Sequence, residues 1–224
     1  MAKRKVAILT PAYDGKTVVD FTLTMIQIFE LNYNLGANLD IVLHCWMYES
    51  IIEKARNNLF TDAFVAGYDD IVMIDADQSF DPMAFFKLLS APVDVVGVPV
   101  RMKTEEERYN LRPEDPKLHQ YDPKTGLIKV ERIGTGLLRL SRKAMAAIFW
   151  SSPEYGDGVM TRRRVFECQI VGGGWNTEDM VFCDKLRELG FDIWVDMTYT
   201  AHHFGIKKWS GDYKKLFKEN YIEG

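Results

Sequence analysis

The sequence predicts an α/β fold in which helices flank a mostly parallel sheet. Short apolar runs alternate with helix-like segments through roughly the first hundred residues, and this alternation is typical of βαβ units. The chain has 224 residues, of which 47% are hydrophobic, so it carries enough apolar material for one core and is short for two. We therefore expect a single domain over residues 1–224.

Four apolar runs predict the parallel strands, and a helix-like segment follows each of the first three. We expect strands at residues 5–9, 39–45, 71–74 and 93–98, and helices at residues 17–35, 50–66 and 82–89. Ligands of such sheets bind beyond the carboxyl ends of the strands. The segments in which a site is expected are therefore residues 10–15, 46–49, 75–78 and 99–103.

The second half predicts shorter elements. Residues 104–125 are polar and contain prolines, which predicts a long loop. Beyond it we expect strands at 127–133 and 137–140, a helix at 141–150, a hairpin across Asp157-Gly158, a helix from Asn176 or Thr177 to Leu189, and extended pieces at 191–196 and 199–203. Gly190 is expected to end the last helix.

Charge and composition argue against several classes of protein. The formal net charge is −4, so no global basic field favours nucleic-acid backbones. The three cysteines are widely and irregularly spaced, which fits neither a disulfide framework nor a zinc site. No stretch approaches the roughly 18 apolar residues of a transmembrane segment, and the apolar run 6–9 is too short for a signal peptide. We expect reduced thiols and a cytoplasmic protein.

Asp75-Ala76-Asp77 directly follows the third apolar run. Two carboxylates at positions i and i+2 after a strand point roughly the same way. A hard divalent cation such as Mn²⁺ or Mg²⁺ needs such oxygen ligands, and its remaining ligands are usually waters and substrate phosphates. The alternative is a solvated acidic turn, but the position after the third strand favours the metal site.

The run of residues 69–77 resembles the nucleotide-binding core of family 2-like glycosyltransferases with the GT-A fold, which include cellulose and chitin synthases and small stand-alone viral and phage enzymes. Further motifs match that family in order: Thr10-Pro11-Ala12-Tyr13, Ala55-Arg56-Asn57, Gly134-Thr135-Gly136-Leu137-Leu138, Thr177-Glu178-Asp179 and His203-Phe204-Gly205. The resemblance covers residues 6–212, and the joint order of these short motifs carries it.

The resemblance implies a single Rossmann-like GT-A domain with a small antiparallel second sheet. Residues 1–100 would form the nucleotide-binding half, and residues 101–224 the acceptor-binding half with a C-terminal lid. The implied reaction is metal-dependent transfer of one sugar from a nucleotide-diphosphate sugar to an acceptor hydroxyl. A UDP-sugar is favoured as the donor only because the resembled family commonly uses such donors. A QxxRW motif is missing, so processive polymer synthesis is not implied.

The resemblance also assigns residues to the donor and the metal. Asp75, Asp77 and His203 would bind the metal ion, and Gly136 would lie near the donor sugar. The implied donor-binding residues are Thr10, Pro11, Ala12, Tyr13, Arg56, Asp75, Ala76, Asp77, Gly136, Lys207 and Lys208. The two lysines would lie on the lid and neutralise phosphate charge while the lid excludes water.

Alternatives remain open for three of these assignments. His202 adjoins His203, and an HxxG spacing with Lys208 downstream, as in glycogenin-like retaining enzymes, would select His202 as the metal ligand. Arg56 has the alternative of an exposed helix arginine that pairs with Glu53. The lysine pair has the alternative of a solvated basic turn.

Asp179 is implied as the general base that takes the proton of the acceptor hydroxyl. A base that acts opposite the diphosphate predicts inversion at the anomeric carbon. Glu178 is the neighbouring catalytic candidate, and with Trp175 it is implied to bind the acceptor. The same residues also fit a plain helix start, with Asn176 as the N-cap and acids in the first turn, and both interpretations can hold together.

Two rival functions are compatible with parts of the pattern. Residues 75–79 approximate the nucleophile loop of haloacid-dehalogenase-like phosphohydrolases, although that loop normally follows a first strand. The other rival is a non-catalytic nucleotide-sugar-binding module. The acceptor is left open between a glycan, a glycoconjugate and a hydroxymethylated base of viral DNA. The basic cluster at residues 162–164 mildly favours the DNA base. If the protein is viral, the cytoplasm would be that of the host.

Overall fold

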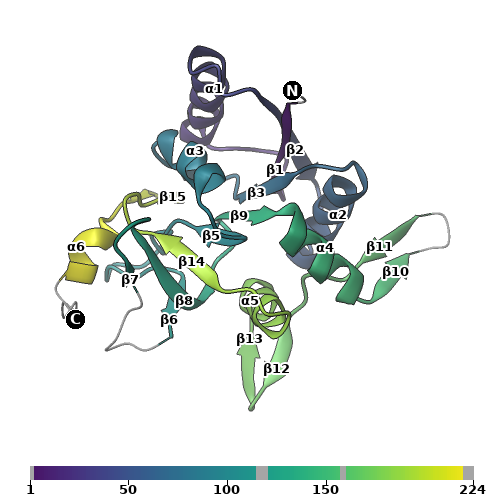
Figure 1. Cartoon of the computed structure of the whole chain (residues 1–224). Coiled ribbons are helices and arrows are strands. Elements are labelled where there is room, and N and C mark those ends of the chain that lie inside the picture. Colours follow the sequence, from purple (N-terminus) through teal and green to yellow (C-terminus); the bar gives the residue numbers. More distant parts are fainter. Residues whose placement is uncertain (1–2, 115–120, 157–159, 219–224) are drawn as a thin grey trace.

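A nine-stranded sheet forms the centre of the computed structural model, which describes residues 3–114, 121–156 and 160–218 (Figure 1). Its strand order is β2-β1-β3-β9-β5-β14-β8-β6, and β7 also pairs with β8. The strands are β1 (Arg4–Ala12), β2 (Leu39–Met47), β3 (Asp70–Ile74), β5 (Val95–Gly97), β6 (Leu111–Pro113), β7 (Tyr121–Asp122), β8 (Leu127–Ile133), β9 (Leu137–Ser141) and β14 (Ile193–Asp196). The helices are α1 (Val19–Asn34), α2 (Ile52–Val65), α3 (Met83–Ser90), α4 (Arg142–Ser151), α5 (Glu178–Glu188) and α6 (Tyr213–Lys218).

The strands of this sheet run mostly in one direction. β1 pairs in parallel with β2 and β3, and β5 pairs in parallel with β14. Only β8 and β9 run against the other strands of the sheet, because all of their pairings are antiparallel. The four strands expected in the first half are β1, β2, β3 and β5, and α1, α2 and α3 are the expected helices. The predicted α/β fold class is therefore confirmed.

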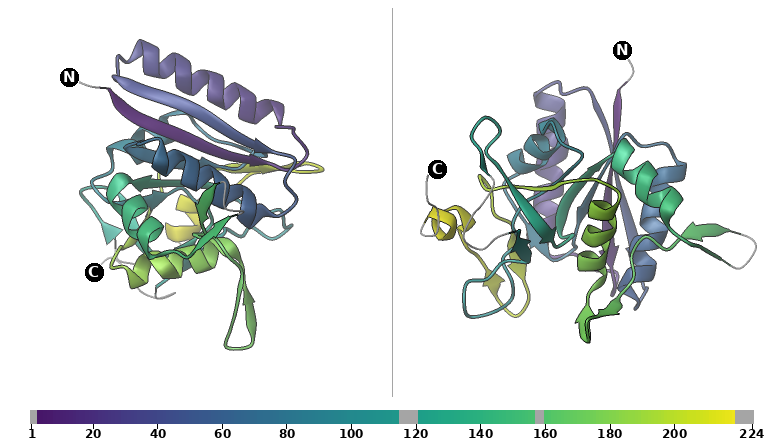
Figure 2. Two further views of the ribbon diagram at one scale, coloured as in Figure 1. Left: turned by 90° about the vertical axis from the view of Figure 1, so that its right-hand side faces the viewer. Right: turned by 60° about the horizontal axis from the view of Figure 1, so that its bottom comes forward.

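Helices cover both faces of the sheet, and side chains alternate between the two resulting cores (Figure 2). In β1, Ala7 and Leu9 belong to one buried cluster, and Val6 and Ile8 belong to the other. This alternation follows from the two-residue period of a strand. α2, α4 and α5 pack on the first face, and α1 and α3 pack on the second. A strand buried on both faces must be apolar throughout, which is why these runs were visible in the sequence.

The segment 104–125 departs from the expected structureless loop. It contains β6 and β7, which both pair antiparallel with β8. The pairing of β6 shifts register between Arg112 and Pro113, where proline lacks the N–H that a regular ladder needs. These strands have only two or three residues and are half exposed, so no apolar period marks them in the sequence. Residues 115–120 lie outside the described part of the chain.

Small antiparallel sheets complete the fold, and the predicted second sheet is confirmed. β15 (His202–Phe204) pairs with β16 (Lys208–Trp209) on one side and with β4 (Gln78–Ser79) on the other. β10 (Glu154–Gly156) and β11 (Thr161–Arg163) form the expected hairpin, although the predicted turn Asp157-Gly158 lies outside the described residues. β12 (Gln169–Val171) and β13 (Gly174–Asn176) form a hairpin that projects from the body in Figure 1.

The remaining fold-level expectations concern membranes and thiols. Within the part of the chain that the structure describes, no helix is long and apolar enough to cross a membrane. Cys45, Cys168 and Cys183 are all free. Cys183 is buried, and burial raises its thiol pKa to about 12, so it packs as a small apolar side chain. The three cysteines therefore form no disulfide with one another in this structure.

Candidate active site

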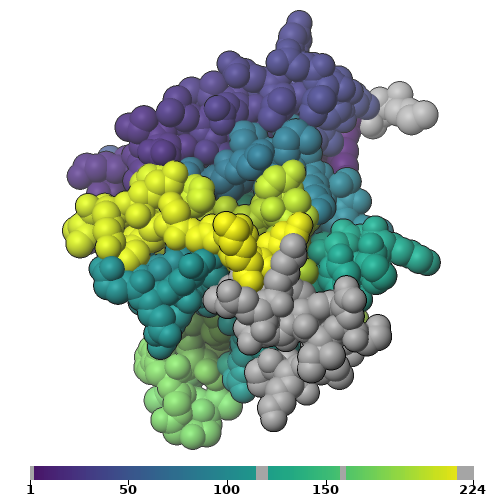
Figure 3. Space-filling view, turned by 90° about the vertical axis from the view of Figure 1, so that its left-hand side faces the viewer, coloured from purple at the N-terminus to yellow at the C-terminus, as the bar shows by residue number. Residues whose placement is uncertain are grey.

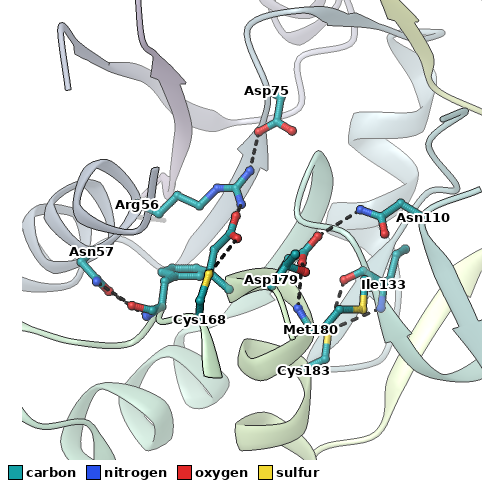
Figure 4. A network of polar contacts seen from close by, with 12 residues as sticks. Arg56, Asn57, Asp75, Asn110, Ile133, Cys168, Asp179, Met180 and Cys183 are labelled. Carbon is teal, nitrogen blue, oxygen red and sulfur yellow. Dashed lines mark hydrogen bonds and ion pairs between the residues drawn. The ribbon is translucent and has the colours of Figure 1, made fainter. Parts of the chain in front are cut away.

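A buried arginine of α2 connects two acidic segments of the molecule. Arg56 is 8% exposed, and its Nη2 donates to Asp75 Oδ1 over 2.9 Å. Its Nη1 donates to Glu178 Oε1 at the start of α5. A buried guanidinium needs such partners because an unpaired buried charge is very costly. The alternative of an exposed arginine paired with Glu53 is therefore wrong, and Figure 4 shows the side chain directed at Asp75.

The acidic turn after β3 is held by backbone hydrogen bonds from separate segments. Asp75 N donates to Gly136 O over 3.2 Å, and Val18 N donates to Ala76 O over 3.1 Å. Phe204 N donates to Asp77 O over 2.8 Å. These bonds fix the turn to three parts of the chain. The pairing of β4 with β15 then brings the histidine segment against it.

Gly136 lies close against Gln78, because an added Cβ would collide with the Gln78 amide unless that side chain moved. Gln78 is 1% exposed, and its Nε2 donates to Asp75 Oδ2 over 3.3 Å. Both carboxylate oxygens of Asp75 are thus used, one by Arg56 and the other by Gln78. Asp75 is consequently held within the protein rather than directed freely into solvent.

Asp77 faces two nitrogen groups. Its Oδ2 lies 2.5 Å from Lys103 Nζ and 3.3 Å from His203 Nε2. Burial raises the pKa of Asp77, but hydrogen bonds and charge from His203 and Lys103 outweigh burial and leave the pKa below its ordinary value. In the register of β15 with β4, His203 is opposite Gln78 and His202 is opposite Ser79. The His202 side chain is half-buried, and burial lowers its pKa. The structure therefore brings His203, and not His202, to the acidic turn.

The chemistry of this pair fits a divalent ion. Two ligands of one ion that are each about 2.1 Å from it and near a right angle apart lie about 3 Å from one another, and Asp77 Oδ2 and His203 Nε2 are 3.3 Å apart. His203 Nδ1 lies 3.2 Å from the carbonyl oxygen of Arg101, the kind of contact that orients a ligating histidine. No group of three or more His, Cys, Asp or Glu side chains that could hold a metal occurs among the described residues. Further ligands would therefore be waters or phosphates.

Two adjoining hollows meet at these residues. The large cleft, of about 650 Å³, is lined by residues that include Pro11, Ala12, Tyr13, Ala76 and Asp77. The small cleft, of about 390 Å³, is lined by residues that include Asn110, Gly136, Glu178 and Asp179. The residues that line both are Arg56, Asp75, Lys103 and His203. A ligand in one cleft would thus meet a ligand in the other at this shared wall.

Asp179 is held firmly at the first turn of α5. Its Oδ1 accepts from Met180 N over 2.9 Å and from Thr177 Oγ1. Its Oδ2 accepts from Asn110 Nδ2 over 3.0 Å, a bond drawn in Figure 4. The carboxylate is 8% exposed and lines the small cleft. The segment starts a helix with acids in its first turn, as expected, but the N-cap is Thr177 and not the expected Asn176. The same geometry keeps the carboxylate at the cleft.

Glu178 differs from its neighbour in environment. Burial raises the pKa of Glu178 above its ordinary value, the charge of Arg56 opposes the rise, and the charge of Asp179 adds to it. One guanidinium is shared by Asp75 and Glu178, with Asp179 nearby. Glu178 is therefore a structural partner of Arg56 as well as a lining residue of the small cleft.

Some predicted site residues lie elsewhere among the described residues. Thr10 is fully buried in β1 and lines neither cleft. Trp175 is 70% exposed on the projecting β12–β13 hairpin and also lines neither. Arg162, Arg163 and Arg164 form ion pairs with Asp62, Glu154 and Glu167 respectively, so the basic cluster is locally neutralised.

The C-terminal segment crosses one face of the molecule. In Figure 3 it lies, in yellow, between the purple N-terminal part and the teal segment around residues 101–113. Lys207 Nζ lies 2.9 Å from Glu105 Oε1, and Asp212 N donates to Glu107 Oε1 over 3.1 Å. Lys208 lies over the ring of Phe204. Neither lysine reaches the two clefts in this arrangement of the described residues.

Sequence reasoning missed two residues of the site, Asn110 and Lys103. Asn110 is in the segment expected to be a structureless loop, and no local pattern marks it. It is pressed against Gly134, whose added Cβ would collide with the Asn110 amide. Lys103 did fall in a segment that follows a predicted strand, residues 99–103, but nothing in the sequence pairs it with Asp77.

No family model matches the sequence, and no curated protein matches it. Among solved structures, A197 from STIV is similar over 90% of this chain and 86% of its own, with 16% identity and a TM-score of 0.54. This chain shares the fold of A197. At this identity the likeness concerns the fold alone.

Other solved structures are similar at lower scores. A Drosophila β-1,4-galactosyltransferase 7 mutant, in complex with manganese, UDP-Gal and xylobiose, has 16% identity, coverage of 87% of this chain and 66% of its own, and a TM-score of 0.45. S. aureus TarS 1-349 in complex with UDP-GlcNAc has 12% identity, coverage of 88% and 58%, and a TM-score of 0.47.

Proposed function

We propose that this chain is a glycosyltransferase that transfers one sugar from a nucleotide-diphosphate sugar to an acceptor hydroxyl. The observation that carries the proposal is the bridge from Asp75 through Arg56 to Glu178, which stands where the two clefts meet. One cleft has the motifs implied for the donor, and the other has the implied base. This is the arrangement that a two-substrate transfer needs.

The donor is proposed to bind in the large cleft. Tyr13 is 69% exposed at its wall and offers an aromatic face to a nucleobase. Arg56 and Lys103 supply positive charge for the diphosphate. The family resemblance favours a UDP-sugar. Lys207 and Lys208 remain proposed as lid residues that would have to move to reach the phosphates.

A divalent cation, Mn²⁺ or Mg²⁺, is proposed to be held by Asp77 and His203, with Asp75 next to them. When bound it would neutralise charge that develops on the departing diphosphate. The protein's own contribution is orientation. The Arg101 carbonyl fixes the ring of His203, and the backbone bond from Phe204 fixes Asp77.

Asp179 is proposed as the general base. Asn110 and Thr177 hold its carboxylate in place, so it has one orientation toward the small cleft. An acceptor hydroxyl there would lose its proton to Asp179 while it attacks a sugar that lies in the large cleft. Attack from the side opposite the diphosphate inverts the anomeric carbon. Glu178 is proposed to bind the acceptor and to hold Arg56.

We favour a glycan or glycoconjugate as the acceptor over a hydroxymethylated DNA base. The three arginines of the basic cluster each form an ion pair with a carboxylate, so they offer little free charge to a phosphate backbone. Trp175, with its exposed ring, is proposed to stack on an acceptor sugar beyond the cleft.

The geometry supports sugar transfer better than phosphate hydrolysis. A haloacid-dehalogenase-like mechanism would use Asp75 as a nucleophile. Asp75 follows the third strand of the chain and not a first one, and its carboxylate is paired with the buried Arg56 guanidinium, which makes it a weaker nucleophile. A non-catalytic binding module would have no need for a second cleft with an oriented carboxylate.

The testing experiment measures donor turnover. The purified protein is incubated with Mn²⁺ and a panel of nucleotide-sugars, and release of nucleoside diphosphate is followed with and without EDTA. We expect metal-dependent release from one donor. Absence of both binding and release across the panel would overturn the proposal.

A further inference from the structure

Lys103 lies where a cation of the site would be expected. Its Nζ is 2.5 Å from Asp77 Oδ2, the same oxygen that lies 3.3 Å from His203 Nε2. The side chains of Lys103 and Asp77 are 38% and 39% exposed, so the contact is open to the clefts. Lys103 also lines both clefts, which places its ammonium at the boundary between them.

The Asp77 carboxylate is the anion that needs a cation there. Its Oδ2 faces both Lys103 Nζ and His203 Nε2. His203 Nδ1 faces the carbonyl oxygen of Arg101, which can only accept a hydrogen bond, so the ring is held with Nε2 toward Asp77. The Lys103 ammonium supplies a full positive charge at the same oxygen.

The lysine side chain is poised to move. Its stem passes over Gly205, where an added Cβ would lie 3.5 Å from Lys103 Cδ, so no side chain at that position confines it. Exposed lysine–carboxylate pairs contribute only about 0–1 kcal/mol, so the bond to Asp77 is readily exchanged. A divalent ion carries twice the charge of the ammonium and needs the same oxygen.

We propose that Lys103 is an internal counter-ion of Asp77, which a divalent ion displaces, and that the displaced ammonium then binds the phosphates of the donor. The inference rests on the proposed function for the identity of the phosphate ligand. It makes Lys103 a competitor of the ion and a partner of the diphosphate. Removal of the lysine should therefore raise the affinity for the divalent ion and lower the affinity for the diphosphate.

The experiment compares wild type with Lys103→Gln and Lys103→Arg. Binding of Mn²⁺ alone is measured from the spin-resonance signal of the free ion, and binding of inorganic pyrophosphate at saturating Mn²⁺ is measured by calorimetry. For Lys103→Gln we expect Mn²⁺ affinity to rise roughly tenfold and pyrophosphate affinity to fall roughly tenfold, each equivalent to about 1.4 kcal/mol. Lys103→Arg keeps the charge and should resemble wild type in both.

Lys143→Gln is the matched control, because Lys143 Nζ pairs with Asp94 Oδ2 over 3.0 Å and neither residue lines a cleft. It removes the same net charge and should change neither affinity. Thermal unfolding verifies that each variant is folded. Equal Mn²⁺ affinity in wild type and Lys103→Gln overturns the counter-ion role and leaves the metal site of the proposed function standing. Unchanged pyrophosphate affinity overturns the phosphate role, and absence of Mn²⁺ binding in every variant overturns this inference and the metal site together.

Discussion

Arg56 and Glu178 are 122 positions apart in the sequence, and their side chains form a hydrogen bond in the wall where the two clefts meet. The same guanidinium bonds Asp75, so one side chain joins α2, the end of β3 and the start of α5. The three elements that would hold the donor, the metal and the acceptor are therefore mutually positioned by one buried charge.

Arg56→Met is expected to destabilise the fold, because it leaves the carboxylates of Asp75 and Glu178 without their cation. Removal of one partner of a buried ion pair costs about 3–5 kcal/mol. Urea unfolding measures the change. Arg108→Met is the control, since the Arg108–Glu106 pair is 63% and 70% exposed and such pairs contribute about 0–1 kcal/mol. Similar losses in the two variants would contradict a structural role for the bridge.

Asp179→Asn is expected to remove turnover and to leave donor binding intact. The amide keeps the shape of the side chain but cannot accept a proton, and loss of a general base costs about 10²–10⁴-fold in rate. Donor binding is measured by calorimetry and turnover by nucleoside diphosphate release in the presence of acceptor. Asp184→Asn, on the same helix but paired with Arg132, should keep full turnover. A rate of the Asp179→Asn variant near that of wild type would exclude Asp179 as the base.

Asn110→Ala is expected to lower kcat with little effect on the KM of the donor. The substitution removes the bond to Asp179 Oδ2 and leaves the large cleft unchanged. Loss of one orienting hydrogen bond to a charged group corresponds to about 1.5–3 kcal/mol, or roughly tenfold or more in rate. Gly134→Ala should reproduce the effect, because its Cβ would displace the same amide. A rise in donor KM with unchanged kcat would argue against a positioning role.

Glu178→Gln is expected to change how stability depends on pH. Burial, which Arg56 opposes and Asp179 reinforces, raises the pKa of Glu178 above 4.5 in the folded state. The folded state thus binds this proton more tightly than the unfolded chain does. The resulting stability is fully present below pH 4.5 and is lost as the pH rises through the raised value. Urea unfolding of both proteins from about pH 4 to 7 should show wild type losing stability relative to the variant. A difference that is independent of pH would contradict the raised pKa.

Local pattern determined much of the fold. β1 and β3 were predicted because strands buried on both faces are continuously apolar, and α1 to α3 were predicted because the helices repeat with their own period. The acidic turn at Asp75 and Asp77 was found for the same reason, since it lies directly after a run that local sequence identifies. Tyr13, which follows β1, and His203, which lies on β15, were predicted from short family motifs, and both line the large cleft.

Only the tertiary structure decided which side chains meet. The contacts of Asn110 with Asp179 and of Lys103 with Asp77 span 69 and 26 positions, and no local period encodes a contact of that range. β6 and β7 exist because β8 offers them an edge, and Arg162 meets its carboxylate partner Asp62 on α2, 100 positions away. The sequence by itself therefore determined the elements and the acidic turn, whereas long-range packing decided the partners of each charge, because those partners depend on distances that exist only after the chain has folded.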